Sequence, residues 1–182
     1  MNKFISIGAP AIGVMAASTL ARAALSSPTD ARVVFDAAGP AGMKIEGTTS
    51  DLNVAEDSGN VVITVPLANL TTGISLRDHH MRDKYLEVPK FPAAVLTIPR
   101  AALKFPNPSE KVEADAQGTI TLHGQSRPVS VHYDTKDDGS TLAAHGTFRV
   151  NMNDFGITVP VYLGVTVKPD VDVIASFRVS KG

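Results

Sequence analysis

Apolar and polar side chains alternate with a period of two along most of this chain, and this pattern limits what the chain can fold into. Near the C-terminus one face of an extended segment is apolar, made by Val171, Val173, Ala175, Phe177 and Val179. Successive side chains of a β-strand point to opposite faces, so the pattern predicts strands that are buried on one side. The same alternation recurs at 33–37, 61–65, 114–122, 129–133 and 148–150. With 43–54 and 94–100, about eight strands are predicted.

Short polar segments separate the predicted strands. Residues 56–60 (EDSGN), 123–125 (HGQ) and 137–139 (DDG) have the composition of tight turns. Residues 76–86 (LRDHHMRDKYL) break the alternation, because they lack Gly and Pro and place apolar residues at loosely helical spacing. We expect one short helical segment there, ending before Pro89. No internal repeat or low-complexity linker is present, so we expect a single folded domain.

Strands with one apolar face must bury that face, either by stacking two sheets or by closing into a barrel. The expected inner faces contain mainly Val, Ala, Ile and Gly, and aromatic residues make up only 5% of the chain. Small side chains in a barrel would leave room for one apolar ligand, whereas a sandwich would pack them without a cavity. Composition and patterning leave both architectures equally open.

The N-terminal residues are typical of an export signal. Lys3 is followed by an uncharged stretch from Phe4 to Leu20, and then by Ala21-Arg22-Ala23, a pattern that signal peptidase recognises. Two glycines and a proline interrupt the stretch, which argues against a membrane-spanning anchor. We therefore predict a cleavable signal peptide at 1–23 and a folded domain at 24–182. The mature protein is expected to be periplasmic or secreted, without stable membrane insertion.

Composition and motifs exclude several function classes. The chain has 17 basic and 18 acidic residues, which argues against nucleic acid as a partner. The absence of cysteine excludes disulfides, zinc ribbons, iron–sulfur sites and a thiol nucleophile. No G-x-S-x-G, H-E-x-x-H or glycine-rich phosphate motif occurs. Adjacent His79 and His80 would point in different directions on a helix, so they make a poor metal-binding pair. We predict no catalytic residue, no metal site and no required cofactor.

Six short patterns occur in an order that resembles the YceI-like family of bacterial exported proteins. In chain order they are residues 32–36 (RVVFD), Gly47, residues 70–73 (LTTG) followed by 77–81 (RDHHM), residues 86–92 (LEVPKFP), residues 118–129 (GTITLHGQSRPV) and residues 153–157 (NDFGI). The resemblance covers residue 32 to the C-terminus. The chain departs from the family pattern at Met152, where members usually carry an arginine.

The resemblance implies an all-β fold, an eight-stranded antiparallel lipocalin-like barrel with one short helical segment. It further implies an internal channel that holds a polyisoprenoid lipid, such as a quinone or a polyprenyl phosphate, as the bound ligand and partner of a non-enzymatic carrier. Three alternatives stay open: a binder of another amphiphile such as a fatty acid or fatty amide, a hydrolase or isomerase that uses the barrel as a reaction chamber, and an interaction sandwich without a cavity. A homodimer is also left open.

Alternation and motif position together select the residues that we expect to bind the ligand. The apolar channel lining is predicted to be Val33, Phe35, Ile45, Ile63, Ile120, Leu122, Val131, Phe148, Phe155 and Phe177. The polar candidates near the channel mouth are Thr72, Arg77, Asp78 and His80, with Arg77 facing a phosphate or quinone headgroup.

A structural interpretation of the polar cluster competes with the functional one. In it, Asp78 caps the helix or pairs with Arg77 or Arg82, and the other polar side chains form a solvated helix face. We favour this interpretation for most of the cluster. We expect His123, His132 and His145 to lie at or near strand turns on the surface.

Overall fold

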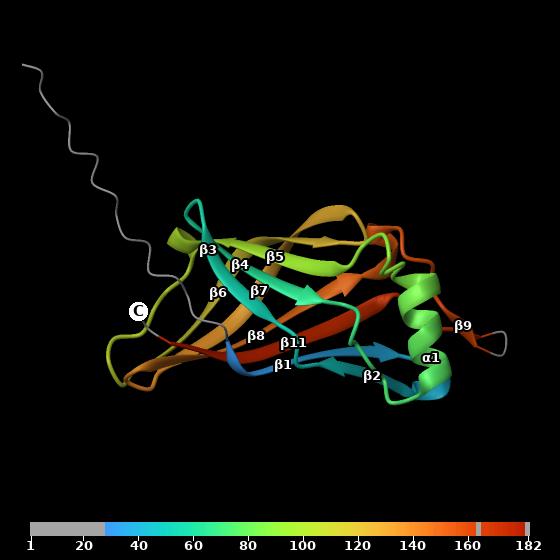
Figure 1. The fold of residues 1–182 in the computed structure, drawn as a ribbon, viewed down its shortest axis with the longest axis horizontal. Helices are drawn as coiled ribbons and strands as arrows, with labels where there is room; N and C mark the ends of the chain where they lie inside the picture. The colour runs from blue at the N-terminus through green and yellow to red at the C-terminus, as the bar shows by residue number, and fades with distance from the viewer. Residues whose placement is uncertain (1–27, 163–164, 181–182) are drawn as a thin grey trace, which may run out of the picture.

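The computed structural model describes residues 28–162 and 165–180, so the predicted signal peptide at 1–23 lies outside the described residues. Nine strands form one antiparallel sheet, with the pairing order β2-β1-β11-β8-β7-β6-β5-β4-β3. Their bounds are β1 (Thr29–Ala38), β2 (Lys44–Thr49), β3 (Asn53–Asp57), β4 (Asn60–Pro66), β5 (Ala93–Pro99), β6 (Lys111–Leu122), β7 (Gln125–Asp137), β8 (Thr141–Asn151) and β11 (Asp170–Ser180). Figure 1 shows these strands curled into an elongated barrel. The all-β, lipocalin-like prediction is confirmed, and the two stacked sheets of the alternative are not formed.

The predicted strand count of eight is wrong for this sheet, because residues 43–54 form two strands instead of one. The pairing is interrupted between β2 and β3, which run in the same direction, and here the backbone N–H of Asp51 donates to Thr49 Oγ1 at 3.1 Å. This side-chain bond replaces a strand hydrogen bond and favours a local break in the strand. As a result β2 and β3 lie at the two opposite edges of the sheet order. A separate hairpin of β9 (Val161–Tyr162) and β10 (Val165–Thr166) adds two short strands.

The predicted helical segment is confirmed and lies across one end of the barrel (Figure 1). Helix α1 (Ser75–His80) continues into a π-helical turn, η2 (Met81–Tyr85), in which the N–H of Leu86 donates to the carbonyl of Met81 at 2.9 Å. The described part of the chain also contains three short 3₁₀ turns: η1 (Pro40–Gly42), η3 (Arg100–Ala102) and η4 (Met152–Phe155). Within the described residues, no helix is both long enough and apolar enough to cross a membrane.

Residues 67–72, here called the closing segment, lead from β4 towards α1 and pair with the free edge of β2. The backbones of Thr48 and Thr71 exchange two hydrogen bonds, at 2.8 and 3.1 Å. The N–H of Leu67 donates to the carbonyl of Pro92 at 2.9 Å, which fixes the start of the segment next to β5. The segment therefore covers part of an edge that would otherwise expose unpaired backbone groups.

Two apolar clusters lie in the interior and share Ile63 and Leu103. The first is built on β5, β6 and β7, and includes Phe155 of η4, which is only 2% exposed. The second is built on β1, β3, β4 and the end of β11, around Val33, Val54 and other buried residues. The strands thus pack with their predicted apolar faces inward.

Candidate functional site

The inner face of the barrel has two walls that differ in how completely they are buried. The packed wall, formed by β5, β6 and β7, has fully buried apolar side chains at Leu96, Ile98, Ala116, Ile120, Val129 and Val131. The accessible wall, formed by β8 and β11, has inward-facing apolar side chains that stay partly exposed: Leu142, Ala144, Phe148, Val150, Val171, Val173, Ala175 and Phe177. Apolar surface inside the barrel is therefore available for a ligand to cover.

Strand register shows that the accessible wall faces inward. Ala175 lies opposite the buried Val33 of β1, and the buried Val179 lies opposite Leu142 of β8. The other face of β11 carries charge, since Asp172 accepts two hydrogen bonds from Arg149 at 2.6 and 2.9 Å. The hydrogen bonds from Arg149 hold the pKa of Asp172 below its ordinary value. Because the two faces differ so strongly, a one-residue register error is excluded for these strands.

Of the ten predicted lining residues, four are buried and six are partly exposed. The buried residues are Val33, Ile120, Val131 and Phe155. The partly exposed residues are Phe35, Ile45, Ile63, Leu122, Phe148 and Phe177. The partly exposed residues are the ones whose side chains a ligand can reach without rearrangement of the core.

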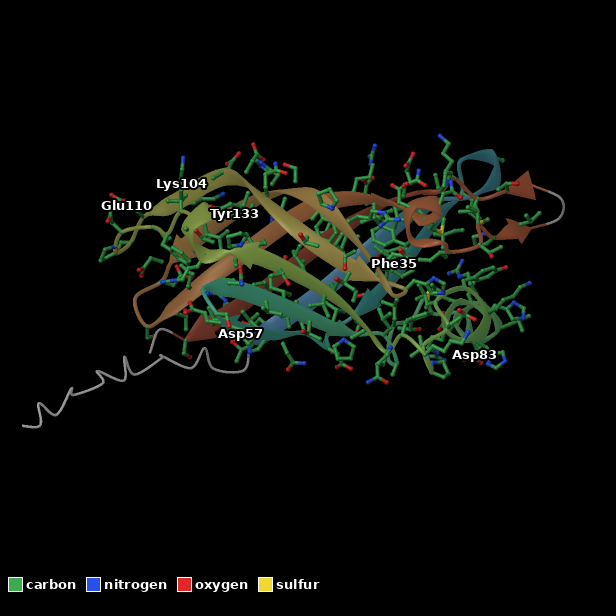
Figure 2. All side chains as sticks on the ribbon, turned by 90° about the horizontal axis from the view of Figure 1, so that it is seen from above. Phe35, Asp57, Asp83, Lys104, Glu110 and Tyr133 are labelled. Carbon is green, nitrogen blue, oxygen red and sulfur yellow. The ribbon has the colours of Figure 1, made fainter. Side chains whose placement is uncertain are left out.

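Phe35 shows how a glycine shapes the interior. Its ring lies over Gly47, the residue opposite it on β2, and a Cβ at position 47 would be 2.0 Å from Phe35 Cε1. Any side chain at 47 would therefore displace the ring. Figure 2 places Phe35 nearer to the end of the barrel that carries α1.

Thr72, Arg77 and Asp78 form one network that holds the closing segment in place. Asp78, 6% exposed, accepts hydrogen bonds from the hydroxyls of Thr71 and Thr72 and, at 2.7 Å, from the N–H of Thr72. Arg77 donates from Nε to Thr72 Oγ1 at 2.7 Å and from Nη2 to the carbonyl of Thr72 at 2.9 Å. Arg82 donates to the carbonyl of Ala68 at 3.1 Å.

The electrostatics of Asp78 follow from these contacts. Burial alone would raise the pKa of its carboxyl group, but the hydrogen bonds from Thr71 and Thr72 and the charge of Arg82 outweigh burial and lower it. Arg77 donates hydrogen bonds to Thr72 and forms no ion pair with Asp78. The polar cluster thus has the structural role that we favoured, but its contacts run to Thr71 and Thr72 and not between Asp78 and Arg77. His80 is exposed, and the network does not include it. No group of three histidine or carboxylate side chains in the described residues could hold a metal ion.

The prediction that His123 is a surface residue is wrong. Its side chain is 14% exposed, with Nδ1 3.0 Å from the carbonyl of Phe155 and Nε2 3.1 Å from Glu87 Oε2. Its ring also packs against Phe91, at 4.5 Å between centroids. The side chain thus joins the β6–β7 turn to η4 and to the segment after η2. Lys90 and, to a lesser extent, His123 lower the pKa of Glu87. His132 and His145 do lie on the surface, but they lie within β7 and β8 and not at the strand turns where we expected them.

Sequence reasoning missed the residues that pack over the packed wall from outside the sheet. Tyr85 and Leu86, from η2 and its end, and Met152 of η4 are partly buried against this cluster. Met152 therefore places an apolar side chain where the family usually has an arginine. The loosely helical spacing of Leu76, His80 and Leu86 was the signal in the sequence that pointed to this segment.

Two surface hollows offer a different environment. One, of about 510 Å³, is lined mainly by hydroxyl, amide and charged side chains of β1, β2 and the closing segment. The other, of about 430 Å³, is lined largely by charged residues, including Asp36, Arg149 and Asp172. Neither has the apolar lining of the barrel interior, so the inner face is the candidate site.

Comparison with known proteins agrees with the fold and with the motif order. The model of the YceI-like domain matches residues 26–179. A UPF0312 protein of Pseudomonas savastanoi pv. phaseolicola is 30% identical over 133 residues, which cover 69% of this chain and 67% of the relative.

Two solved structures share the fold. A polyisoprenoid binding domain from Saccharophagus degradans, implicated in plant cell wall breakdown, aligns with a TM-score of 0.72 at 16% identity, covering 87% of this chain and 98% of that one. BcnA of Burkholderia cenocepacia aligns with a TM-score of 0.64 at 15% identity, covering 81% and 95%. The resemblance seen in the sequence is confirmed, and the chain belongs to the YceI-like family.

Proposed function

We propose that this protein is a periplasmic or secreted carrier that holds a polyisoprenoid lipid, of the quinone or polyprenyl phosphate type, inside its barrel without converting it. The observation that carries the proposal is the accessible wall, a band of apolar side chains that faces inward and stays partly exposed. A carrier must offer such a surface, because the prenyl chain is removed from water only where it packs against apolar side chains.

The shape of this surface suits a linear chain. On β11 the apolar face from Val171 to Val179 follows the strand for about 26 Å, at roughly 3.3 Å per residue. The neighbouring strand β8 adds Phe148 and Val150 on the same face. Burial of apolar area contributes roughly 25 cal/mol per Å² before the costs of association, so a long prenyl chain gains in proportion to the length that it buries.

The family relationship adds support. The solved domain from Saccharophagus degradans is described as polyisoprenoid binding, and it has the same fold. At 16% identity, this similarity supports a shared fold only, so we assign the ligand class to this chain as a proposal. The polar network around Asp78 fits a carrier as well, since its contacts hold backbone segments together.

Lipid analysis of the protein purified from its own host tests the proposal. We expect native mass spectrometry, or solvent extraction, to detect a prenyl lipid, and we expect added quinone or polyprenyl phosphate to raise the thermal unfolding midpoint. An apo protein that responds to fatty acids and ignores prenyl lipids would support the fatty-acid alternative instead. Turnover of an added lipid would contradict the carrier function.

A pair of neighbouring variants locates the binding surface. Ala175→Trp places a large ring inside the barrel, opposite Val33, whereas Ser176→Trp places the same ring on the opposite face of the strand. We expect the first variant to lose the lipid-dependent rise in unfolding temperature and the second to keep it. Equal behaviour of the two variants would show that the lipid does not bind at the inner face.

A further inference from the structure

Large apolar side chains are exposed mainly at one end of the barrel. We call this the helix end, because it carries α1, η1 and the β9–β10 hairpin (Figure 1). In the described part of the chain, four of the five exposed large hydrophobic residues belong to these elements or adjoin them: Met43, Ile74, Leu76 and Val161, with exposures of 44%, 54%, 67% and 59%. The fifth, Phe105, lies in the loop of residues 103–110, at the opposite end.

Hydrogen bonds and both views place these elements together. The N–H of Lys168 donates to the carbonyl of Ala38 at 2.8 Å, and the N–H of Gly39 donates to the carbonyl of Met43 at 2.6 Å. The base of the β9–β10 hairpin is therefore next to the turn that carries Met43. Figure 2 shows α1, η1 and the hairpin at one end, with Lys104 and Glu110 at the other.

Positive charge without a carboxylate partner gathers at the same end. Among the described residues, six Lys and Arg side chains have no carboxylate within ion-pair distance, and five belong to the helix end: Arg77, Arg82, Lys84, Arg127 and Lys168. Lys84 lies over the ring of Tyr85, 5.4 Å from its centroid. Arg127 follows the β6–β7 turn, which contacts η4 through His123. The sixth, Lys104, lies at the opposite end (Figure 2).

We propose that the helix end docks on the surface of an anionic lipid bilayer. Apolar side chains that reach into the interface, together with unpaired cations near lipid phosphates, are the combination that holds proteins at such surfaces. This inference rests on the proposed function, because docking would bring one end of the barrel to the membrane from which a prenyl lipid must come. A second copy is a poor occupant of this surface, since two helix ends would bring like charges together.

Site-specific labels test the docking, and the chain has no native cysteine to interfere. Leu76→Cys and the matched control Phe105→Cys are each labelled with an environment-sensitive fluorophore in the full-length chain. Vesicles of phosphatidylcholine with phosphatidylglycerol should shift the emission of the label at 76 to the blue and leave the label at 105 unchanged. Vesicles of phosphatidylcholine alone, or high salt, should weaken the shift.

Several results would overturn the docking proposal. Equal shifts at the two positions, a shift only at 105, or no shift at either would show that the helix end does not face the bilayer. An equal response to neutral vesicles would contradict the role of charge. A shift at 76 that needs no vesicles and grows with protein concentration would show that a second copy covers this surface.

Charge variants separate docking from lipid binding. Lys84→Gln with Lys168→Gln removes two unpaired cations, and we expect vesicle affinity to fall about thirtyfold. Lys111→Gln with Lys136→Gln is the control, because these lysines pair with Asp134 and Asp138. Thermal stabilisation by a water-soluble short-chain quinone should be the same in both pairs. If the quinone stabilises neither the parent chain nor any variant, the result would count against the proposed function. If the two pairs of variants bind vesicles with equal affinity, the result would count against docking.

Discussion

The packed wall and the accessible wall are built from the same kinds of residue, yet most inward side chains are buried in the packed wall and partly exposed in the accessible wall. Both consist of Val, Ile, Leu, Ala and Gly on alternating positions, with few rings. The difference comes from what lies over each wall. Phe155, Ile157 and Met152, from η4 and its end, and Tyr85 and Leu86, from η2 and its end, all pack against the first cluster. Among the residues that the structure describes, the second cluster, which β11 joins, receives only Leu52 and Leu103 from outside the strands.

Two glycines show the same contrast at atomic distances. A Cβ on Gly118 of the packed wall would lie 2.9 Å from the carbonyl oxygen of Thr97 and 3.0 Å from a side-chain carbon of Ile98. A Cβ on Gly146 of the accessible wall would have its nearest neighbour at 3.5 Å, an ordinary contact. Glycine therefore allows close approach of strands in one wall and leaves room in the other. Segments outside the sheet therefore decide where the inner face is covered.

Removal of an aromatic ring from each wall in turn should change the free energy of unfolding most. Phe155→Ala should cost about 3–5 kcal/mol of unfolding free energy, because the ring is buried and its neighbours cannot fill the gap. Phe177→Ala should cost about 1–2 kcal/mol, because part of this ring is already exposed. Urea denaturation measures both. Equal costs would show that the two walls do not differ in packing.

The direction of side chains in this comparison could be predicted from the sequence, whereas their burial could not. Alternation has a strict period, so inward positions such as Ile120 and Phe177 follow from the pattern alone. Whether an inward residue is covered depends on contacts with distant segments. Phe155 and Phe177 are both inward rings in the sequence, but only Phe155 belongs to a turn that folds back onto the packed wall.

Two errors of prediction have the same origin. The strand break at 50–52 contains neither Gly nor Pro, and it is held by the bond between Thr49 and Asp51, which alternation does not reveal. His123 is covered by Phe155 and Glu87, which lie 32 and 36 residues away in the chain. Local patterns cannot indicate such contacts, so turn residues and cap residues are the ones for which sequence reasoning fails.

A smaller effect is expected from the network that attaches the closing segment to β2, the edge strand on the side of the accessible wall. Asp78→Asn weakens the bonds to Thr71 and Thr72 and should cost about 1–3 kcal/mol. Hydrogen exchange should then rise in β2 and β1 while β6 and β7 stay protected. Equal exchange in all four strands would mean that the network stabilises the whole barrel and not this edge.

The pH dependence of this network has a definite sign. The pKa of Asp78 is lowered in the folded protein, so the unfolded chain binds the proton more readily. The contribution of Asp78 is therefore complete above the ordinary carboxyl pKa and is lost as the pH falls through the lowered value. Asp78→Asn should flatten the acid limb of the stability curve. An unchanged acid limb would show that other carboxylates cause the loss.

The smallest effect is expected on the outer face of the packed wall, where His132 lies between two carboxylates. Its Nδ1 is 2.9 Å from Asp115 and its Nε2 is 3.4 Å from Glu113. The hydrogen bond to Asp115, followed by the charges of Asp115 and Glu113, raises the pKa of His132. The interactions of His132 with Asp115 and Glu113 therefore stabilise the fold fully below the ordinary histidine pKa. This stabilisation is lost as the pH rises through the raised pKa of His132.

Asp115→Asn tests how much the charges on the outer face of the packed wall contribute to stability, compared with its buried side chains. NMR titration should show the pKa of His132 moving back towards its ordinary value, because the first acceptor loses its charge. The unfolding temperature near pH 6 should fall only slightly, since exposed ion pairs are screened by water. A large fall would mean that surface charges, and not the buried side chains beneath them, hold the packed wall together. Because β7 presents Val131 and Tyr133 inward on either side of His132, we expect the core contacts to dominate and the variant to bind lipid as the parent chain does.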